Sequence, residues 1–216
     1  MITRALASDE ILLIAVRHGE TESNAAHRFI GQCDSPLSAV GRKQIVALGE
    51  RLQEEALDRI HASDLGRAAD TAREVAKHHA ADPAFDKRLR ERHYGELEGL
   101  GFEESKQRYP EVFEAFDRFE IETPIPGGES AQQVRDRISA FVRESVTPHP
   151  GMTHIVVCHG GVVRALFWHL LDLPYSAARY ARSDNTSVSV FRFVRGRWHL
   201  ERWNDTGHLV PLSGKR

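Results

Sequence analysis

Histidine, arginine and glutamate side chains stand at the ends of four short segments that are predicted to form strands. These segments cover residues 11–16, 59–62, 84–91 and 154–158. The polar runs at their ends are Arg17-His18-Gly19-Glu20-Thr21, Ser63-Asp64-Leu65-Gly66-Arg67, Arg90-Glu91-Arg92-His93-Tyr94-Gly95 and His159-Gly160-Gly161. A chain that gathers two histidines, at least two arginines and a glutamate in this way carries the side chains that phosphate chemistry uses.

Each residue type has a defined use in the transfer of a phosphate group. Arg17 and Arg67 present planar guanidinium forks that match phosphate oxygens. A neutral imidazole can attack phosphorus, and an imidazolium can hold an oxygen of the transferring group, so either His18 or His159 qualifies as the nucleophile. A carboxylic acid such as Glu91 can protonate the leaving oxygen and later activate water. Arginines and histidines can stabilise the charge of the transition state in this arrangement, so we expect no metal and no cofactor.

The elements that must position these residues alternate between strand and helix. The apolar run 11–16 is typical of a strand buried on both faces, and strands are also predicted at 59–62, 84–91 (weaker), 154–158, 186–194 and 198–203. Helices are predicted at about 38–55, 66–80, 130–146 and 161–171. This order indicates an α/β fold with a mainly parallel sheet. Ligands bind at the carboxyl ends of parallel strands, so we expect the polar runs to share one edge.

The residue composition changes between Gly99 and Gly128, where five aromatic residues stand among charged residues and three prolines. We expect one or two short amphipathic helices there, as an excursion from a single domain that spans residues 1–216. Seven acidic residues lie in this excursion: Glu103, Glu104, Glu111, Glu114, Asp117, Glu120 and Glu122.

The composition excludes several classes of protein. The 216 residues carry 29 Lys plus Arg and 31 Asp plus Glu, so no general basic field attracts nucleic acid. Two cysteines, Cys33 and Cys158, cannot form a disulfide framework or a zinc site. No apolar run could span a bilayer, and residues 1–10 form a polar lead-in without the features of a signal peptide. We therefore expect a cytoplasmic protein that binds a small phosphorylated substrate and binds neither nucleic acid nor a membrane. A homodimer is compatible with the sequence.

Taken singly, each residue also has an ordinary structural explanation. A histidine at a strand end is more often hydrogen-bonded than nucleophilic, and Arg67 or Glu91 alone would be a surface charge. Most of the 12 histidines, including His154, are assigned to core packing or to the surface. Trp168 is assigned to the core. Joint placement at four strand ends favours a site.

These motifs together resemble the histidine phosphatase superfamily, also called phosphoglycerate mutase-like. The resemblance begins at Arg17-His18-Gly19-Glu20-Thr21 and Asn24 and continues through the stretch 31–38, Ser63-Asp64-Leu65 with Arg67, and Glu91 with Gly95. It ends with Gly127-Gly128-Glu129-Ser130, His159-Gly160-Gly161 and Asn204-Asp205-Thr206. It implies a three-layer α/β/α sandwich with a helical lid at about residues 99–128 that helps to select the substrate.

The resemblance also implies a role for each site residue. His18 is the implied nucleophile that becomes phosphohistidine, and Glu91 the general acid and base. Arg17, Arg67 and His159 are implied to hold the phosphate. The implied substrate contacts are Asn24, Gly31, Tyr94 and Gly160.

The family contains both hydrolases and mutases, and the sequence points in both directions. Glu91-Arg92-His93-Tyr94-Gly95 is similar to the motif of cofactor-dependent phosphoglycerate mutases, but position 102 is Phe where those enzymes carry a substrate-binding lysine. A mutase also needs an enclosing, basic lid, whereas this lid is acidic in sequence. We expect a phosphomonoester hydrolase, with a 2,3-bisphosphoglycerate-dependent mutase as the alternative. A non-catalytic phosphate-binding module is a third hypothesis, which the presence of His18 and Glu91 disfavours.

Overall fold

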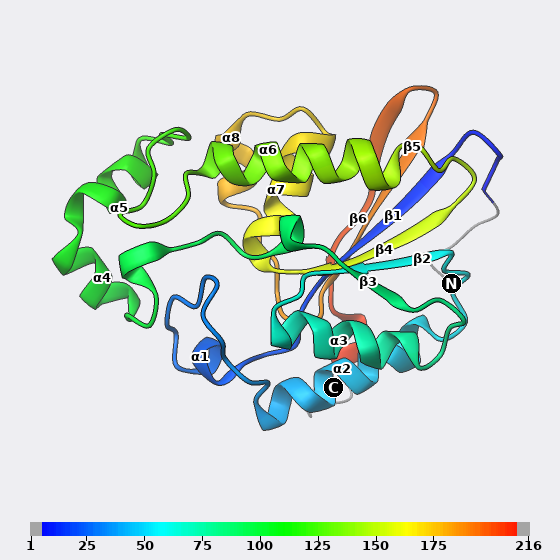
Figure 1. Ribbon diagram of the computed structural model, residues 1–216, viewed down its shortest axis with the longest axis horizontal. Helices are drawn as coiled ribbons and strands as arrows, with labels where there is room; N and C mark the ends of the chain where they lie inside the picture. The colour runs from blue at the N-terminus through cyan, green and yellow to red at the C-terminus, as the bar shows by residue number, and fades with distance from the viewer. Residues whose placement is uncertain (1–5, 211–216) are drawn as a thin grey trace.

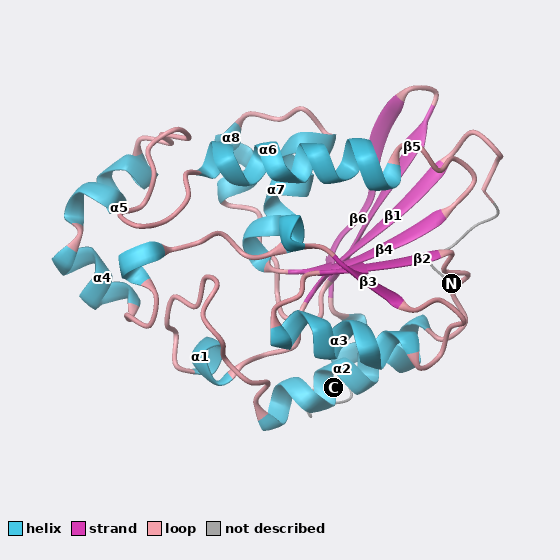
Figure 2. Ribbon diagram, in the orientation of Figure 1, coloured by secondary structure: helices cyan, strands magenta, loops and turns pink. Residues whose placement is uncertain are grey.

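A six-stranded sheet in the order β3-β2-β4-β1-β5-β6 forms the centre of the protein (Figures 1 and 2). The computed structural model describes residues 6–210, so the first half of the expected lead-in lies outside the described residues. The strands are β1 (Ile11–Arg17), β2 (Arg59–Ala62), β3 (Pro83–Phe85), β4 (Thr153–Cys158), β5 (Val188–Val194) and β6 (Arg197–Asp205). Strands β1 to β4 run parallel, and β5 and β6 add an antiparallel hairpin beside β1. The α/β class and the mainly parallel sheet are confirmed.

Helices cover both faces of this sheet and make three layers (Figure 1). Helices α2 (Ala39–Leu52) and α3 (Gly66–Ala76) pack on one face, where Leu48, Leu52 and Val75 join a buried cluster with strand residues. Helices α6 (Ala131–Phe141) and α7 (Gly160–Leu170) pack on the other, where Ile138 and Leu166 belong to a second cluster. Because β1 and β4 are covered on both sides, nearly every one of their residues is buried.

Caps define where the helices begin. The Ser38 side chain accepts the amide proton of Gly41 at the start of α2, and Ser130 forms a capping box with Gln133 at the start of α6. Helix α6 continues as a π-helical turn, η3 (Val142–Val146), so the predicted helix 130–146 is confirmed. Helices α2 and α3 end three to four residues earlier than predicted. Val40, in the first turn of α2, is 53% exposed.

The weak strand expected at 84–91 is wrong over most of its length. Strand β3 ends at Phe85, and a 3-10 turn, η1 (Lys87–Leu89), follows. Asp86 causes this ending because its carboxylate accepts the amide proton of Arg88 and caps the turn. Glu91 therefore lies in a loop beyond the sheet and not at a strand end.

The excursion at residues 99–128, called the lid below, contains two short helices where one or two were expected: α4 (Phe102–Arg108) and α5 (Pro110–Asp117). Figure 1 shows them at one end of the molecule, away from the sheet. The lid has its own small core, in which Val112, Phe113, Phe116 and Ile125 pack against Leu97 of the 3-10 turn η2 (Gly95–Leu97). Three short helices that were not predicted complete the fold: α1 (Glu22–Ala25), α8 (Tyr175–Arg179) and η4 (Gly207–Leu209). No helix within residues 6–210 has the length and apolar character to cross a membrane.

Candidate active site

A basic pocket of about 160 Å³ opens where β1 and β4 end and where α7 begins. Eight of the nine predicted site residues line it: Arg17, His18, Asn24, Gly31, Arg67, Glu91, Tyr94 and Gly160. The ninth, His159, is fully buried, with its ring centroid 5.0 Å from that of His18. His18 and His159 lie close together because β1 and β4 pair in parallel, with Arg17 opposite Cys158.

The His18 ring has a fixed orientation and a fixed tautomer. Its Nδ1 lies 2.7 Å from the carbonyl oxygen of Gly19, which can only accept, so Nδ1 carries the proton. The other nitrogen, Nε2, then holds a free electron pair and accepts a hydrogen bond from Arg67 Nε over 3.3 Å. Burial and the nearby charges of Arg67 and Arg17 hold the pKa of His18 well below its ordinary value. A neutral imidazole with Nε2 unprotonated is the form that can attack phosphorus.

Arg67 is held in place by the backbone of the loop before α2. Its two terminal nitrogens donate to the carbonyl oxygens of Gly31 (2.7 Å) and Cys33 (3.0 Å), and its side chain is almost fully buried. Gly31 has a φ of +56°, and a Cβ there would stand 1.9 Å from Glu98 Oε1, so only glycine fits. Besides its predicted role as a substrate contact, Gly31 therefore anchors Arg67 through its carbonyl oxygen.

Ser63 determines the proton position on His159. Its Oγ accepts the Leu65 amide proton and lies 2.8 Å from His159 Nε2. Because no other acceptor for the hydroxyl proton is found among the described residues, we assign that proton to the hydrogen bond with Nε2 and the ring proton to Nδ1. His159 Nδ1 is buried and has no hydrogen-bond partner within residues 6–210. It is thus a donor without an acceptor beside the His18 ring.

Backbone amides hold the Glu91 carboxylate at the pocket rim. Oε1 accepts the amide proton of Arg92 (2.8 Å), and Oε2 accepts that of Gly161 (3.0 Å) in the first turn of α7. The Glu91 carbonyl is fixed in turn by Gln32 and Arg137. Within residues 6–210 this carboxylate makes no ion pair, and amides hold it beside a basic pocket, so it is well placed to exchange protons with a ligand.

Further donors complete the pocket. Arg17 donates to the Ser183 carbonyl, and its Nε is buried with no partner among the described residues. Asn24 uses Oδ1 to accept from Thr21 and Asn185, so its amino group is the part available to a ligand. Gly160 is the first residue of α7, where amide groups lack intrahelical acceptors and attract anions. The pocket therefore matches a phosphate group in charge and in donor geometry.

Comparison with known proteins decides the family. A model of the histidine phosphatase superfamily (branch 1) matches residues 13–206. The chain belongs to the histidine phosphatase superfamily.

Named members of the superfamily resemble this chain over most of its length. A metal-independent phosphoserine phosphatase of Arabidopsis thaliana is 39% identical over 204 residues, covering 93% of this chain and 84% of the relative. Phosphoglycerate mutase-like protein 4 of the same plant is 37% identical, covering 91% and 86%. The solved structure of a mycobacterial glucosyl-3-phosphoglycerate phosphatase has 33% identity and a TM-score of 0.78, covering 90% of this chain and 99% of that one.

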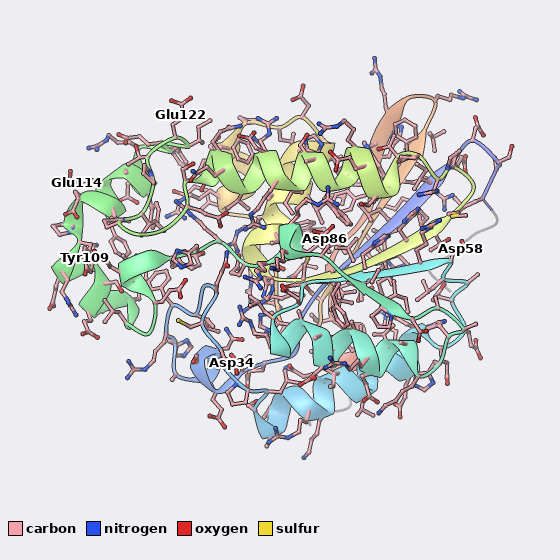
Figure 3. All side chains as sticks on the ribbon, viewed as in Figure 1. Asp34, Asp58, Asp86, Tyr109, Glu114 and Glu122 are labelled. Carbon is pink, nitrogen blue, oxygen red and sulfur yellow. The ribbon has the colours of Figure 1, made fainter. Side chains whose placement is uncertain are left out.

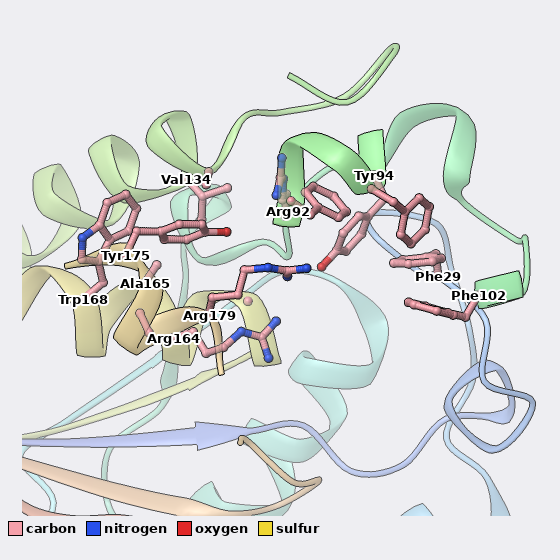
Figure 4. A pocket seen from close by; sticks show the side chains of 15 residues that line it. Phe29, Arg92, Tyr94, Phe102, Val134, Arg164, Ala165, Trp168, Tyr175 and Arg179 are labelled. Carbon is pink, nitrogen blue, oxygen red and sulfur yellow. The ribbon is translucent and has the colours of Figure 1, made fainter. Parts of the chain in front are cut away.

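A second cavity of about 250 Å³ adjoins the basic pocket and shares Phe29, Tyr94 and Arg164 with it. It lies between the lid and the helices α7 and α8, and we call it the aromatic chamber (Figure 4). Its aromatic walls are Phe29, Tyr94, Phe102, Phe113, Phe116, Trp168 and Tyr175. Its basic residues are Arg92, Arg164 and Arg179.

Most residues of this chamber were not predicted to be site residues from the sequence. Arg164 and Trp168 lie on α7, where an arginine ordinarily indicates a solvated face and a tryptophan indicates core. The one available signal was position: Arg164 stands one turn into the helix that follows His159, close to the pocket edge. Trp168 is buried as expected, but its ring lines the chamber and packs at a tilt against Tyr175, with ring centroids 4.8 Å apart.

The acidic residues of the lid do not bear on the pocket. All of them are partly or fully exposed, and none lines either cavity; Figure 3 shows Glu114 and Glu122 pointing outward. The inner surface of the lid is aromatic and faces arginines. The expectation that an acidic lid separates this chain from the mutases is therefore wrong, because the charge of the lid lies on its outer face.

Cys33 is exposed, and its thiol lies 2.8 Å from Glu98 Oε2. This hydrogen bond raises the pKa of the thiol, which reduces its thiolate fraction and its reactivity. Burial likewise raises the pKa of Cys158 in β4.

Within residues 6–210 no group of three or more histidine, cysteine or acidic residues is arranged to hold a metal ion.

Proposed function

We propose that this chain is a phosphomonoester hydrolase that acts on a small phosphorylated metabolite through a phosphohistidine on His18, with Glu91 as general acid and base. The observation that carries the proposal is the His18 ring, whose Nδ1 proton is committed to Gly19 and whose unprotonated Nε2 accepts a hydrogen bond from Arg67, which also lines the basic pocket. The phosphatase relatives support the choice of reaction.

In the first step His18 Nε2 attacks phosphorus, and the bond between phosphorus and the ester oxygen breaks. Glu91 gives its proton to the departing oxygen, so the alcohol leaves neutral. Arg17, Arg67 and the Nδ1 proton of His159 hold the equatorial oxygens, where charge is concentrated in the transition state. The product of this step is phosphohistidine and free alcohol.

In the second step Glu91, now a carboxylate, takes a proton from water as the water attacks the phosphohistidine. The bond between Nε2 and phosphorus breaks, and the electron pair returns to the imidazole. Inorganic phosphate leaves and Glu91 holds its proton again, so the enzyme is restored without any other reactant.

A mutase remains the second candidate, and two observations favour it: the basic chamber beside the pocket and the mutase-like relative. A mutase would return the phosphoryl group to another hydroxyl instead of to water. The hydrolase is preferred because Phe102, in place of the lysine of the mutases, lies at the chamber wall and is 52% exposed.

The test is to follow phosphate release from a panel of phosphate esters, with His18→Ala and, as a matched control, His199→Ala on the exposed face of β6. We expect His18→Ala to lose at least about a thousandfold in kcat/KM and His199→Ala to match the wild type. Wild-type rates in His18→Ala would overturn the proposal. Isomerisation of phosphoglycerate faster than hydrolysis, with 2,3-bisphosphoglycerate supplied, would establish the mutase instead.

A further inference from the structure

Three arginines line the aromatic chamber: Arg92, Arg164 and Arg179. Arg164 and Arg179 make no ion pair and no hydrogen bond within residues 6–210, and no acidic residue is among the fifteen that line the chamber. Arg92 is buried, and its Nε donates only to a backbone carbonyl, that of Glu129. Arg164 and Arg179 are half-buried, so their unpaired N–H groups are available to an anion that enters the chamber.

The charges and the aromatic walls face the same space. The Arg179 guanidinium lies 4.9 Å over the Phe116 ring, and Arg92 lies 5.3 Å from the same ring. In Figure 4 the guanidinium groups of Arg164 and Arg179 extend from α7 and α8 toward Tyr94. Stacking on Phe116 orients the Arg179 fork while leaving its N–H groups free, as bidentate recognition of a carboxylate requires.

The size and lining of the chamber suit more than a small acid. Its volume of about 250 Å³ is near the range of roughly 300–1,000 Å³ that is usual for small-molecule sites with apolar walls. Phe29 and Phe102 stack at 6.5 Å on one side, while Trp168 and Tyr175 form the other end. A three-carbon acid beside the phosphate would reach Arg164 but would leave these rings uncovered.

We infer that the preferred substrate is a phosphate monoester whose leaving group carries both a ring and a carboxylate or second anionic group. The phosphate occupies the basic pocket, Arg164 and Arg179 bind the second anion, and the ring packs against the aromatic walls. This inference rests on the proposed phosphatase activity and adds the class of leaving group to it.

Four alkyl phosphates with leaving groups of similar type separate the two features. Ethyl phosphate has neither feature, phosphoglycolate has the carboxylate, benzyl phosphate has the ring, and 4-carboxybenzyl phosphate has both. We expect kcat/KM for 4-carboxybenzyl phosphate to exceed that for benzyl phosphate and for phosphoglycolate by about tenfold or more each. Equal kcat/KM for the four esters would overturn the inference while leaving the phosphatase in place, whereas no phosphate release from any ester would overturn the proposed function.

Arg179→Met tests the carboxylate contact, because methionine keeps an apolar stem over Phe116. We expect it to lower kcat/KM for 4-carboxybenzyl phosphate by about tenfold and to lower that for benzyl phosphate much less. The matched control is Arg118→Met at the end of α5, whose side chain is exposed and paired with Glu114 and Glu120. An equal loss with both esters would mean that Arg179 only holds the lid against α8, and would contradict the proposed contact.

Discussion

A Cβ atom at position 161 would lie 2.2 Å from Oε1 of Glu91, so the proposed acid and the first turn of α7 fit together only because residue 161 is glycine. The same glycine donates its amide proton to Glu91 Oε2. One residue thus provides both the space for the carboxylate and one of its two amide contacts.

Gly161→Ala should displace the Glu91 carboxylate and lower kcat/KM for alkyl phosphates by roughly a hundredfold, the size of a typical general-acid contribution. The loss should be much smaller with 2,4-dinitrophenyl phosphate, because its leaving group needs no proton. Gly101→Ala is the control, since a Cβ there meets no atom within 4 Å. An equal loss with both kinds of ester would contradict the role of Glu91 as acid.

Arg67→Lys should cost at least about a hundredfold in kcat/KM, because one ammonium cannot contact Gly31, Cys33 and His18 in the way the guanidinium does. The matched control is Arg73→Lys on the same helix, whose side chain is 60% exposed. Steady-state kinetics on one ester, with thermal unfolding of both variants, would check this. A loss in Arg67→Lys no larger than in Arg73→Lys would show that the guanidinium geometry is unimportant.

Acid should destabilise the fold through a buried histidine pair at the other end of the sheet. His61 Nε2 and His154 Nδ1 lie 3.1 Å apart on neighbouring strands. Burial and Arg59 lower the pKa of His61 to about 4, and burial and His61 lower the pKa of His154 to about 3. Between these values and the ordinary histidine pKa of about 6.5, the unfolded chain binds more protons than the folded one.

The contribution of this pair to the free energy of unfolding should therefore be fully present above about pH 6.5 and should be lost as the pH falls toward 4. The free energy of unfolding should fall by up to about 1.4 kcal/mol per pH unit for each proton taken up on unfolding. Urea unfolding at a series of pH values measures the slope. His154→Leu should reduce that slope without abolishing it, because His18 and His159 also have lowered pKa values. His199→Ala should leave the slope unchanged, and an unchanged slope in His154→Leu would refute the assignment.

The sequence predicted the parts of the site that follow strands and helix starts. His18 and His159 follow β1 and β4, two strands whose continuous apolar runs are distinctive, and Arg67 opens α3. Glu91 was found for a partly wrong reason, since the strand expected before it ends at Phe85. The residue type was informative there although the local structure was not.

The aromatic chamber could not be predicted because its residues come from segments with no shared local signal. Arg179 belongs to the short helix α8, while Phe29 precedes Gly31 in a loop and Phe116 lies on the lid. Which side of the lid helices faces inward depends on their packing against Leu97 and Ile125. Composition alone therefore made the lid look acidic, whereas its buried face is aromatic.

The central claim is that His18 carries the phosphoryl group, and one measurement tests it most directly. The enzyme is mixed with a phosphate ester, stopped within the first turnovers in alkali, which preserves phosphohistidine, and digested for mass spectrometry. We predict one added phosphoryl group on the peptide that contains His18, and none in His18→Ala. Turnover by the wild type with a phosphoryl group on another residue, or with none on His18 at any time point, would contradict the account.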